Sequence, residues 1–371
     1  MPTKIGRSPR SNQELLQISA AIPIDSLAPP RSLYRMNPTE PLGDAPPPPP
    51  VIDFKDRRRG LMVFGILEIL LGVLCLLMVG LMVLGQAMAS RAGGGAAFNA
   101  QMMVPAMVVY VTLAAGFVWL GIGSIRYRRW ARALVLILAW FWLCVGVITI
   151  PLLGVVMPRI LAGSAPNGQG LPPGMLVTVM VFQLVFMTLF FVVLPGVLVF
   201  FYQSRHVKAT CEARDPVRRW TDACPLPALA VACSLWLGSI MMLAIPFAYR
   251  GTMPCFGTIV TGLPGTLLAL ALAALFFWLG GMWYRLKAAG WWWLLATLVV
   301  LSISNFITFS RVDLIDLYQK MGYPEAQLEM IRRQGWLSSG FMLWNSLVWL
   351  VPMLGYLVWV RRFFRPAPEG R

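Results

Sequence analysis

Glu68 is the residue best placed to do chemistry in this 371-residue chain, because it is the one ionisable side chain well inside a long apolar segment. A charged carboxylate is costly at that depth, so we expect Glu68 to be neutral, to face other helices, or to reach water. It could bind a proton or a cation, or it could hold helices together as a neutral hydrogen-bonding group. Gln183, Asn305 and Asn345, which lie in other apolar segments, are further candidates for an inward-facing ligand or ion site.

Catalytic motifs give no support for an enzyme. The chain contains no phosphate-binding loop, no nucleophile elbow and no zinc-protease helix motif. His206 is its single histidine, which removes most acid–base schemes. Cys211 and Cys224 lie in the same segment, but a structural metal site usually takes four Cys or His ligands in close pairs, and only three, none of them closely spaced, are present here. We therefore expect no enzyme activity, no cofactor and no metal site.

Long apolar segments dominate the rest of the chain. Apolar residues make up 58% of the sequence and charged residues 12%, against about 45–50% and about 25% in soluble domains. A helix needs about 20 apolar residues to cross a bilayer. Eight segments meet that length: 60–85, 103–125, 131–157, 175–202, 226–248, 264–284, 290–310 and 338–361. The fold class predicted is an all-α integral membrane protein with eight transmembrane helices.

The net charge of +16 has a topological explanation. Of the 31 Lys and Arg residues, 24 fall in the N-terminal tail, the C-terminus and the loops after the second, fourth and sixth helices. Cytoplasmic loops retain Lys and Arg. This pattern predicts a plasma-membrane protein with both termini in the cytoplasm and the lipid bilayer, not nucleic acid, as its partner.

The apolar segments also repeat. Residues 117–121 (FVWLG) match residues 276–280 (FFWLG), and an arginine follows each at the same distance. Pro195 in the fourth helix matches Pro352 in the eighth. Matches in the same order along the chain predict two four-helix halves. Because each half has an even number of helices, both halves enter the membrane in the same orientation.

Five parts follow from this organisation. They are a Pro-rich tail (1–55), a first four-helix half (56–202), a cytoplasmic linker (203–225), a second half (226–361) and a C-terminal tail (362–371). The N-terminal tail buries too little apolar area to fold, so we expect it to be disordered apart from a possible short helix in 12–22. The alternating charges of the linker predict a compact, ordered connector, with a turn or helix start at Asp215-Pro216. Two short helices are expected to form a cap in the outer loop 311–337.

Two functions remain open. The first is a non-catalytic membrane protein that binds partners through the N-terminal tail, the 203–225 linker or the 311–337 outer loop. The second is a transporter or channel-like carrier of a small solute or ion, with Glu68 as the proton or cation site. Scarce polar groups inside the helices favour the first, and the parallel repeat with proline-interrupted helices favours the second. A water-accessible cavity that reaches Glu68 would favour transport.

Overall fold

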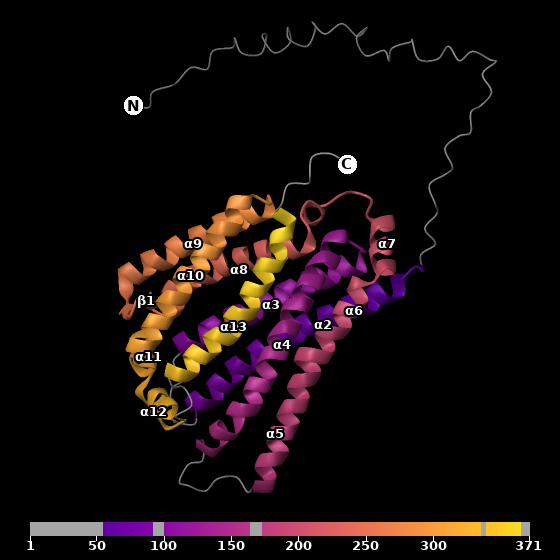
Figure 1. The fold of residues 1–371 in the computed structure, drawn as a ribbon. Helices are drawn as coiled ribbons and strands as arrows, with labels where there is room; N and C mark the ends of the chain where they lie inside the picture. The colour runs from indigo at the N-terminus through magenta and orange to yellow at the C-terminus, as the bar shows by residue number, and fades with distance from the viewer. Residues whose placement is uncertain (1–54, 92–99, 164–172, 335–338, 365–371) are drawn as a thin grey trace, which may run out of the picture. The chain divides into compact units, whose positions relative to one another are not determined.

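The computed structural model describes residues 55–91, 100–163, 173–334 and 339–364, which belong to one compact unit, and the predicted tail and its short helix lie outside them. Within these ranges, eight helical segments are long and apolar enough to cross a membrane, as predicted, and they indicate a multi-pass membrane protein. The helices are α2 (Arg58–Arg91), α3 (Ala100–Ile125), α4 (Arg129–Gly163), the run α5 (Pro173–Thr188), η4 (Leu189–Val193) and α6 (Leu194–Gln203), then α8 (Leu226–Ala248), α9 (Gly262–Tyr284), α10 (Ala288–Arg311) and α13 (Ser339–Val360) (Figure 1).

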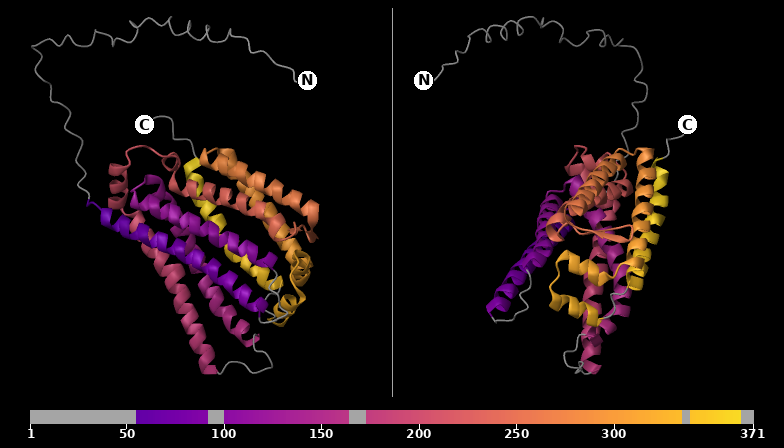
Figure 2. Two further views of the ribbon diagram at one scale, coloured as in Figure 1. Left: turned by 180° about the vertical axis from the view of Figure 1, so that it is seen from behind. Right: turned by 90° about the vertical axis from the view of Figure 1, so that its left-hand side faces the viewer.

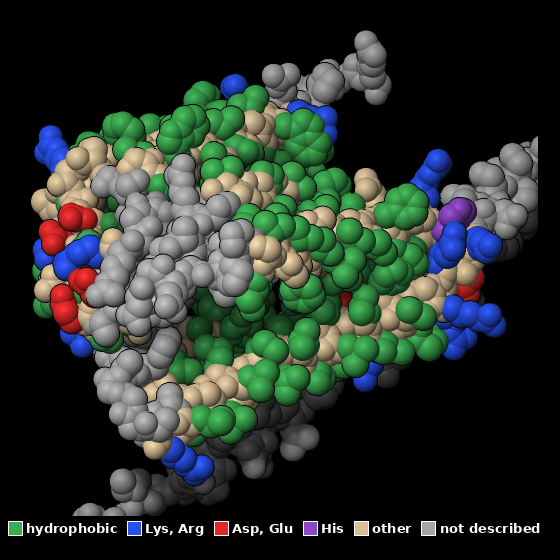
Figure 3. All heavy atoms as spheres, turned by 90° about the horizontal axis from the view of Figure 1, so that it is seen from below, with side chains coloured by type: hydrophobic (Ala, Val, Ile, Leu, Met, Phe, Trp, Pro, Cys, Tyr) green, Lys and Arg blue, Asp and Glu red, His purple; other side chains and the backbone are tan. Residues whose placement is uncertain are grey.

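The lateral faces of these helices are apolar and exposed. No more than 33% of any of the eight apolar segments is buried, and large side chains such as Phe182, Phe200 and Phe247 lie on the surface. Figure 3 shows hydrophobic side chains over most of the visible face, with charged groups gathered mainly toward its two ends. Such a surface is stable in lipid and would be a liability in water.

Close backbone contact joins α2 to α3. A Cβ added to Gly65 would lie 2.8 Å from the backbone oxygen of Gly121, and one added to Gly121 would lie 2.6 Å from the oxygen of Gly65. One repeat of seven residues further along, Gly72 approaches the oxygen of Ala114 in the same way. Small residues of this kind let helices pack tightly in lipid, where hydrophobic burial supplies little driving force.

Two short connectors at one end of the bundle are built alike. Residues 126–128 join α3 to α4, and residues 285–287 join α9 to α10. In each connector the central residue, Tyr127 or Leu286, has a left-handed φ of 55° or 52°. The hydrogen bonds also correspond. In the first connector, Tyr127 N donates to Ser124 O and Arg128 N to Gly123 O. In the second connector, Leu286 N donates to Trp283 O and Lys287 N to Met282 O. Both are Schellman caps that satisfy the last carbonyls of a helix.

A π-helical turn, η4, interrupts the fourth transmembrane segment. Pro195 follows η4 by two residues and has no N–H to donate to the carbonyl of Phe191, four residues earlier. Gly146 of α4 lies directly against that carbonyl, since a Cβ there would collide with it. The interruption predicted at Pro195 is therefore a change of helix type that lets α4 approach closely.

The linker is ordered, as its charge pattern predicts. It forms α7 (Arg205–Arg214) and a 3₁₀ turn, η5 (Trp220–Asp222). Val207 and Cys211 on one face of α7 are buried among the ends of the first-half helices. Asp215 does not start a helix here: it is the C-terminal cap of α7, and its buried side chain is paired with Arg219 and Arg128.

The opposite end carries a cap. Helices α11 (Leu314–Met321) and α12 (Glu325–Gln334) confirm the two predicted short helices. A two-stranded antiparallel hairpin, β1 (Met253–Cys255) and β2 (Thr258–Val260), was not predicted. Its turn is fixed to α10 by hydrogen bonds from Phe256 N to Ser304 Oγ (3.0 Å) and from Gly257 N to Thr308 Oγ1 (3.0 Å). Figure 2 gives two further views of this cap and of the linker.

Candidate functional site

A triad of buried polar side chains lies between α2, α3 and α6. The Ser124 hydroxyl donates to Oε2 of Glu68 over 3.0 Å, and the Tyr202 hydroxyl lies 2.9 Å from Oε1 of Glu68. Tyr202 and Ser124 are also 2.9 Å apart, oxygen to oxygen. All three residues are at most 1% exposed. The expectation that Glu68 faces other helices is confirmed.

Helix packing explains why these three residues meet. Glu68 lies ten residues into α2, about 15 Å along its axis, whereas Ser124 and Tyr202 are next to the last residues of α3 and α6. The start of α2 therefore extends beyond the ends of the other two helices. The contact between Gly65 and Gly121 sets this register, because each glycine lies three residues from a triad member.

The triad has three oxygen–oxygen contacts at hydrogen-bonding distance. The two hydroxyl groups supply one proton each. With Glu68 ionised, the two hydroxyl protons can form only two hydrogen bonds, so the third oxygen–oxygen contact has none. With Glu68 neutral, its own proton completes a closed ring of three hydrogen bonds. The arrangement can therefore bind a proton, or it can hold three helices together as a neutral hydrogen-bonded group.

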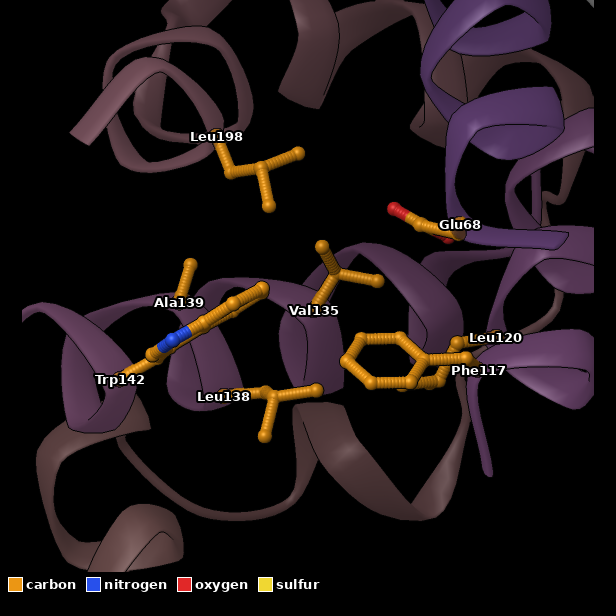
Figure 4. Close-up of a pocket in the computed structure, with 8 residues that line it drawn as sticks. All are labelled: Glu68, Phe117, Leu120, Val135, Leu138, Ala139, Trp142 and Leu198. Atoms are coloured by element: carbon orange, nitrogen blue, oxygen red, sulfur yellow. The ribbon is translucent and has the colours of Figure 1, made fainter. Parts of the chain in front are cut away.

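A small pocket borders the carboxyl group. Figure 4 shows Glu68 directed toward a space whose other walls are apolar. The lining residues besides Glu68 are Phe117, Leu120, Val135, Leu138, Ala139, Trp142 and Leu198. The pocket has an empty volume of about 220 Å³, of which the part open to a water-sized molecule admits about one water. Such a lining offers no further ligand for a cation.

The other predicted site residues lie apart from the triad. Gln183 is partly buried on α5, Asn305 is exposed on α10 and Asn345 is partly buried on α13. Among the described residues, the carboxylate of Glu68 receives its hydrogen bonds from Ser124 and Tyr202 instead. Sequence reasoning missed these two because each lies within three residues of an arginine outside the apolar segments, a position expected at the boundary between membrane and water.

A second polar cluster surrounds Asp215 in the linker. Arg219 donates two hydrogen bonds to this carboxylate, at 3.2 and 3.0 Å, and Arg128 approaches it to 3.4 Å. The side chain of Asp215 is 3% exposed. Hydrogen bonding from Arg219 lowers the pKa of Asp215, against the opposing effect of desolvation. The carboxylate thus joins the linker to the α3–α4 connector.

The segment before α2 is held by the same linker. Asp56 forms an ion pair with Arg214 at 3.3 Å, and the backbone N–H of Arg57 donates to the Thr210 hydroxyl over 3.1 Å. Arg129 of α4 donates to the carbonyl of Glu212 over 3.3 Å. These contacts fix the linker on two sides, so its outer face has a defined shape.

The two linker cysteines are buried thiols. Cys211 is 1% exposed and Cys224 is 5% exposed. Desolvation raises the pKa of each thiol to about 11, which leaves little thiolate at neutral pH. Their chemistry is that of packed side chains and not of nucleophiles.

No group of three or more His, Cys, Asp or Glu residues arranged to hold a metal ion is found in the part of the chain that the structure describes. Comparison of the chain with family models, curated proteins and solved structures finds no match. The functional interpretation therefore rests on the geometry of the triad, the linker and the surfaces around them.

Proposed function

We propose that this multi-pass membrane protein is non-catalytic and binds a protein partner through the outer face of its linker. The observation that carries the proposal is the locking of the linker by Asp215, whose buried carboxylate binds Arg219 and Arg128. A flexible loop would lose conformational entropy on binding a partner, whereas a fixed surface has already lost it. A connector that only joined two helices would not need a buried carboxylate held by two arginines.

The outer face has the chemistry of a binding surface. Val217 and Trp220 are 59% and 43% exposed, and Arg218 lies between them in the sequence. Trp and Arg are the residue types most enriched at the energetic centres of interfaces. The exposed charged residues of the linker are Arg205, Lys208, Arg214 and Arg218, with Glu212 and Asp222. This excess of positive charge favours a partner segment with acidic and apolar side chains.

Site-specific photo-crosslinking tests the partner. A photoreactive residue at Val217 should give an adduct of one defined mass in cells, and Arg218→Glu should abolish that adduct. The same photoreactive residue at Lys320, in the cap, serves as the control position. Equal labelling from both positions, or no adduct from Val217, would contradict partner binding at the linker.

Transport is the second candidate, and the pocket beside Glu68 is the observation that favours it. The small volume of that pocket, its apolar lining and the completed hydrogen bonds of the carboxyl group favour a structural role instead. Proton flux into proteoliposomes decides between the two. Under transport, flux depends on pH in the wild type and is lost in Glu68→Gln; under partner binding, neither protein conducts.

We also propose that the two four-helix halves arose by duplication and that the linker end faces the cytoplasm at the plasma membrane. The corresponding Schellman caps at 126–128 and 285–287 support the duplication. At the offsets of the sequence matches, Glu68, Ser124 and Tyr202 correspond to Ser234, Trp283 and Trp359. The polar triad is thus a feature of the first half alone.

A further inference from the structure

Four cations at the linker end of the second half have no acidic neighbours in sequence. Arg285 and Lys287 lie in the α9–α10 connector, and Arg361 and Arg362 begin the 3₁₀ turn η6 (Arg361–Phe364) that follows α13. All four are exposed. No Asp or Glu occurs between residues 222 and 313, or between residues 329 and 369. Among the described residues, no carboxylate forms an ion pair with any of the four.

Three arginines of the first half at the same end are paired instead. Arg128, Arg129 and Arg214 form ion pairs with Asp215, Asp222 and Asp56. The charge of these three is balanced within the protein. The charge of the second-half cations is left for a ligand or for solvent.

Aromatic rings hold two of these cations in place. The guanidinium of Arg361 lies 4.8 Å from the ring centre of Trp291 and 5.2 Å from that of Trp292. The guanidinium of Arg362 lies 4.2 Å from the ring centre of Trp359. Stacking of this kind fixes the plane of a guanidinium and leaves its edge N–H groups free to donate.

The two segments that carry the four cations are in contact. The ring of Trp283, two residues before Arg285, lies 4.8 Å from the ring of Phe364, centre to centre. The indole N–H of Trp291, four residues after Lys287, donates to the carbonyl of Leu357 over 2.9 Å. These contacts join the 285–287 connector to η6, so the two segments that carry the cations lie together at one end of the bundle.

We propose that this surface, formed by Arg285, Lys287, Arg361 and Arg362, binds the phosphate headgroup of an acidic phospholipid. Phosphate is the anion whose oxygens suit arginine N–H donors with charge assistance. The exposed rings of Trp292 and Trp293, 58% and 54% exposed, lie at the end of an apolar helix, where tryptophan lies at headgroup level in membranes. An acidic protein segment would have to reach the same depth, which favours lipid.

Native mass spectrometry of the detergent-solubilised full-length protein, titrated with phosphatidylglycerol, tests this site. Each cation near an anionic headgroup contributes about 1 kcal/mol, so the double variant Arg361→Gln/Arg362→Gln should weaken retention of the first bound lipid about 30-fold. The variant Arg361→Lys/Arg362→Lys should keep most of the affinity. The matched control, Arg311→Gln/Lys320→Gln, removes two exposed cations from the opposite end and should leave retention unchanged.

Two parallel titrations identify the source of the phosphate group. Phosphatidylcholine should be retained weakly and equally by all variants, because its headgroup carries no net charge. Inorganic phosphate should not displace phosphatidylglycerol from the wild type. The proposal is overturned if the Gln pair retains phosphatidylglycerol as the wild type does, or if free phosphate competes fully. None of these outcomes bears on crosslinking from the linker, so the two proposals fail independently.

Discussion

The hydroxyl of Tyr202 lies 2.9 Å from a carboxyl oxygen of Glu68, although 134 residues separate them. This contact joins the last turn of α6 to the first third of α2, and Ser124 adds α3 to the same point. A polar contact inside an apolar bundle is specific because the helices offer few alternative partners at that depth. We expect the contact to set how α2, α3 and α6 are arranged.

Replacing Tyr202 with Phe keeps the buried ring and removes the hydroxyl. One oxygen of Glu68 then loses its donor in a buried site, which costs about 1–3 kcal/mol. A lower midpoint of thermal unfolding in detergent should report the loss. Tyr110→Phe on α3 is the control, because no hydrogen bond involves its hydroxyl among the described residues; an equal shift in both variants would show that the Tyr202 bond is not stabilising.

Substitutions of Glu68 separate shape from charge. Glu68→Gln keeps one donor and one acceptor, which are what a neutral carboxyl offers to Ser124 and Tyr202, so stability should stay within about 1 kcal/mol of wild type. Glu68→Lys places a cation in the bundle at a cost of about 2.5 kcal/mol or more. Size-exclusion chromatography of the detergent extract should show monodisperse Gln protein and aggregated Lys protein. A well-folded Lys variant would mean that the site reaches water.

Two glycines of α3 offer a matched pair. A Cβ at Gly121 would lie 2.6 Å from the backbone oxygen of Gly65, whereas nothing lies within 4 Å of a Cβ at Gly116. Gly121→Val should therefore separate α2 from α3 and disrupt the triad, since overpacking typically costs about 1–3 kcal/mol. Gly116→Val should be tolerated. The yield of folded protein measures both, and equal yields would contradict the close contact.

The stabilisation of the linker by Asp215 can be tested through the reactivity of the buried Cys211 thiol. Asp215→Ala removes the carboxylate that holds Arg219 and Arg128, so the linker should open more often and Cys211 should be alkylated about tenfold faster, from a loss of at least about 1.4 kcal/mol. Glu212→Ala removes only an exposed pair with Lys208, at 3.9 Å, and should leave the rate almost unchanged. Equal rates in the two variants would show that Asp215 does not lock the linker.

The stability that Asp215 gives to the linker should depend on pH. The pKa of Asp215 is lowered in the folded protein, so the folded state binds this proton less readily than the unfolded state. The stability that Asp215 contributes is then fully present above its ordinary value of about 3.9 and is lost as pH falls through the lower folded value. Reactivity of Cys211 toward a reagent that modifies thiols in acid should rise below about pH 4, and should not rise in Asp215→Ala.

How far sequence reasoning reaches is clear from individual residues. The eight apolar helices and the inward position of Glu68 follow from hydropathy and from the cost of a charge in lipid. The partners of Glu68 do not follow, because counting depth along α2 says nothing of where α3 and α6 end. That register depends on a glycine contact between Gly65 and Gly121, which a single sequence does not pair. The β1–β2 hairpin escaped prediction because each strand has only three residues and Pro254 interrupts the first.

The orientation of the protein in the membrane can be tested by cysteine labelling, which requires an exposed target residue. Native Cys211 is a poor reporter because it is 1% exposed. In a variant that lacks the six native cysteines, Val217→Cys in the linker and Lys320→Cys in the cap are exposed alternatives. Cytoplasmic loops retain basic residues, and 24 of the 31 Lys and Arg residues fall in the tails or at the linker end. An impermeant maleimide should therefore label Lys320→Cys in intact cells and Val217→Cys only after permeabilisation, and the reverse pattern would invert the topology and place the proposed partner and lipid sites outside the cell.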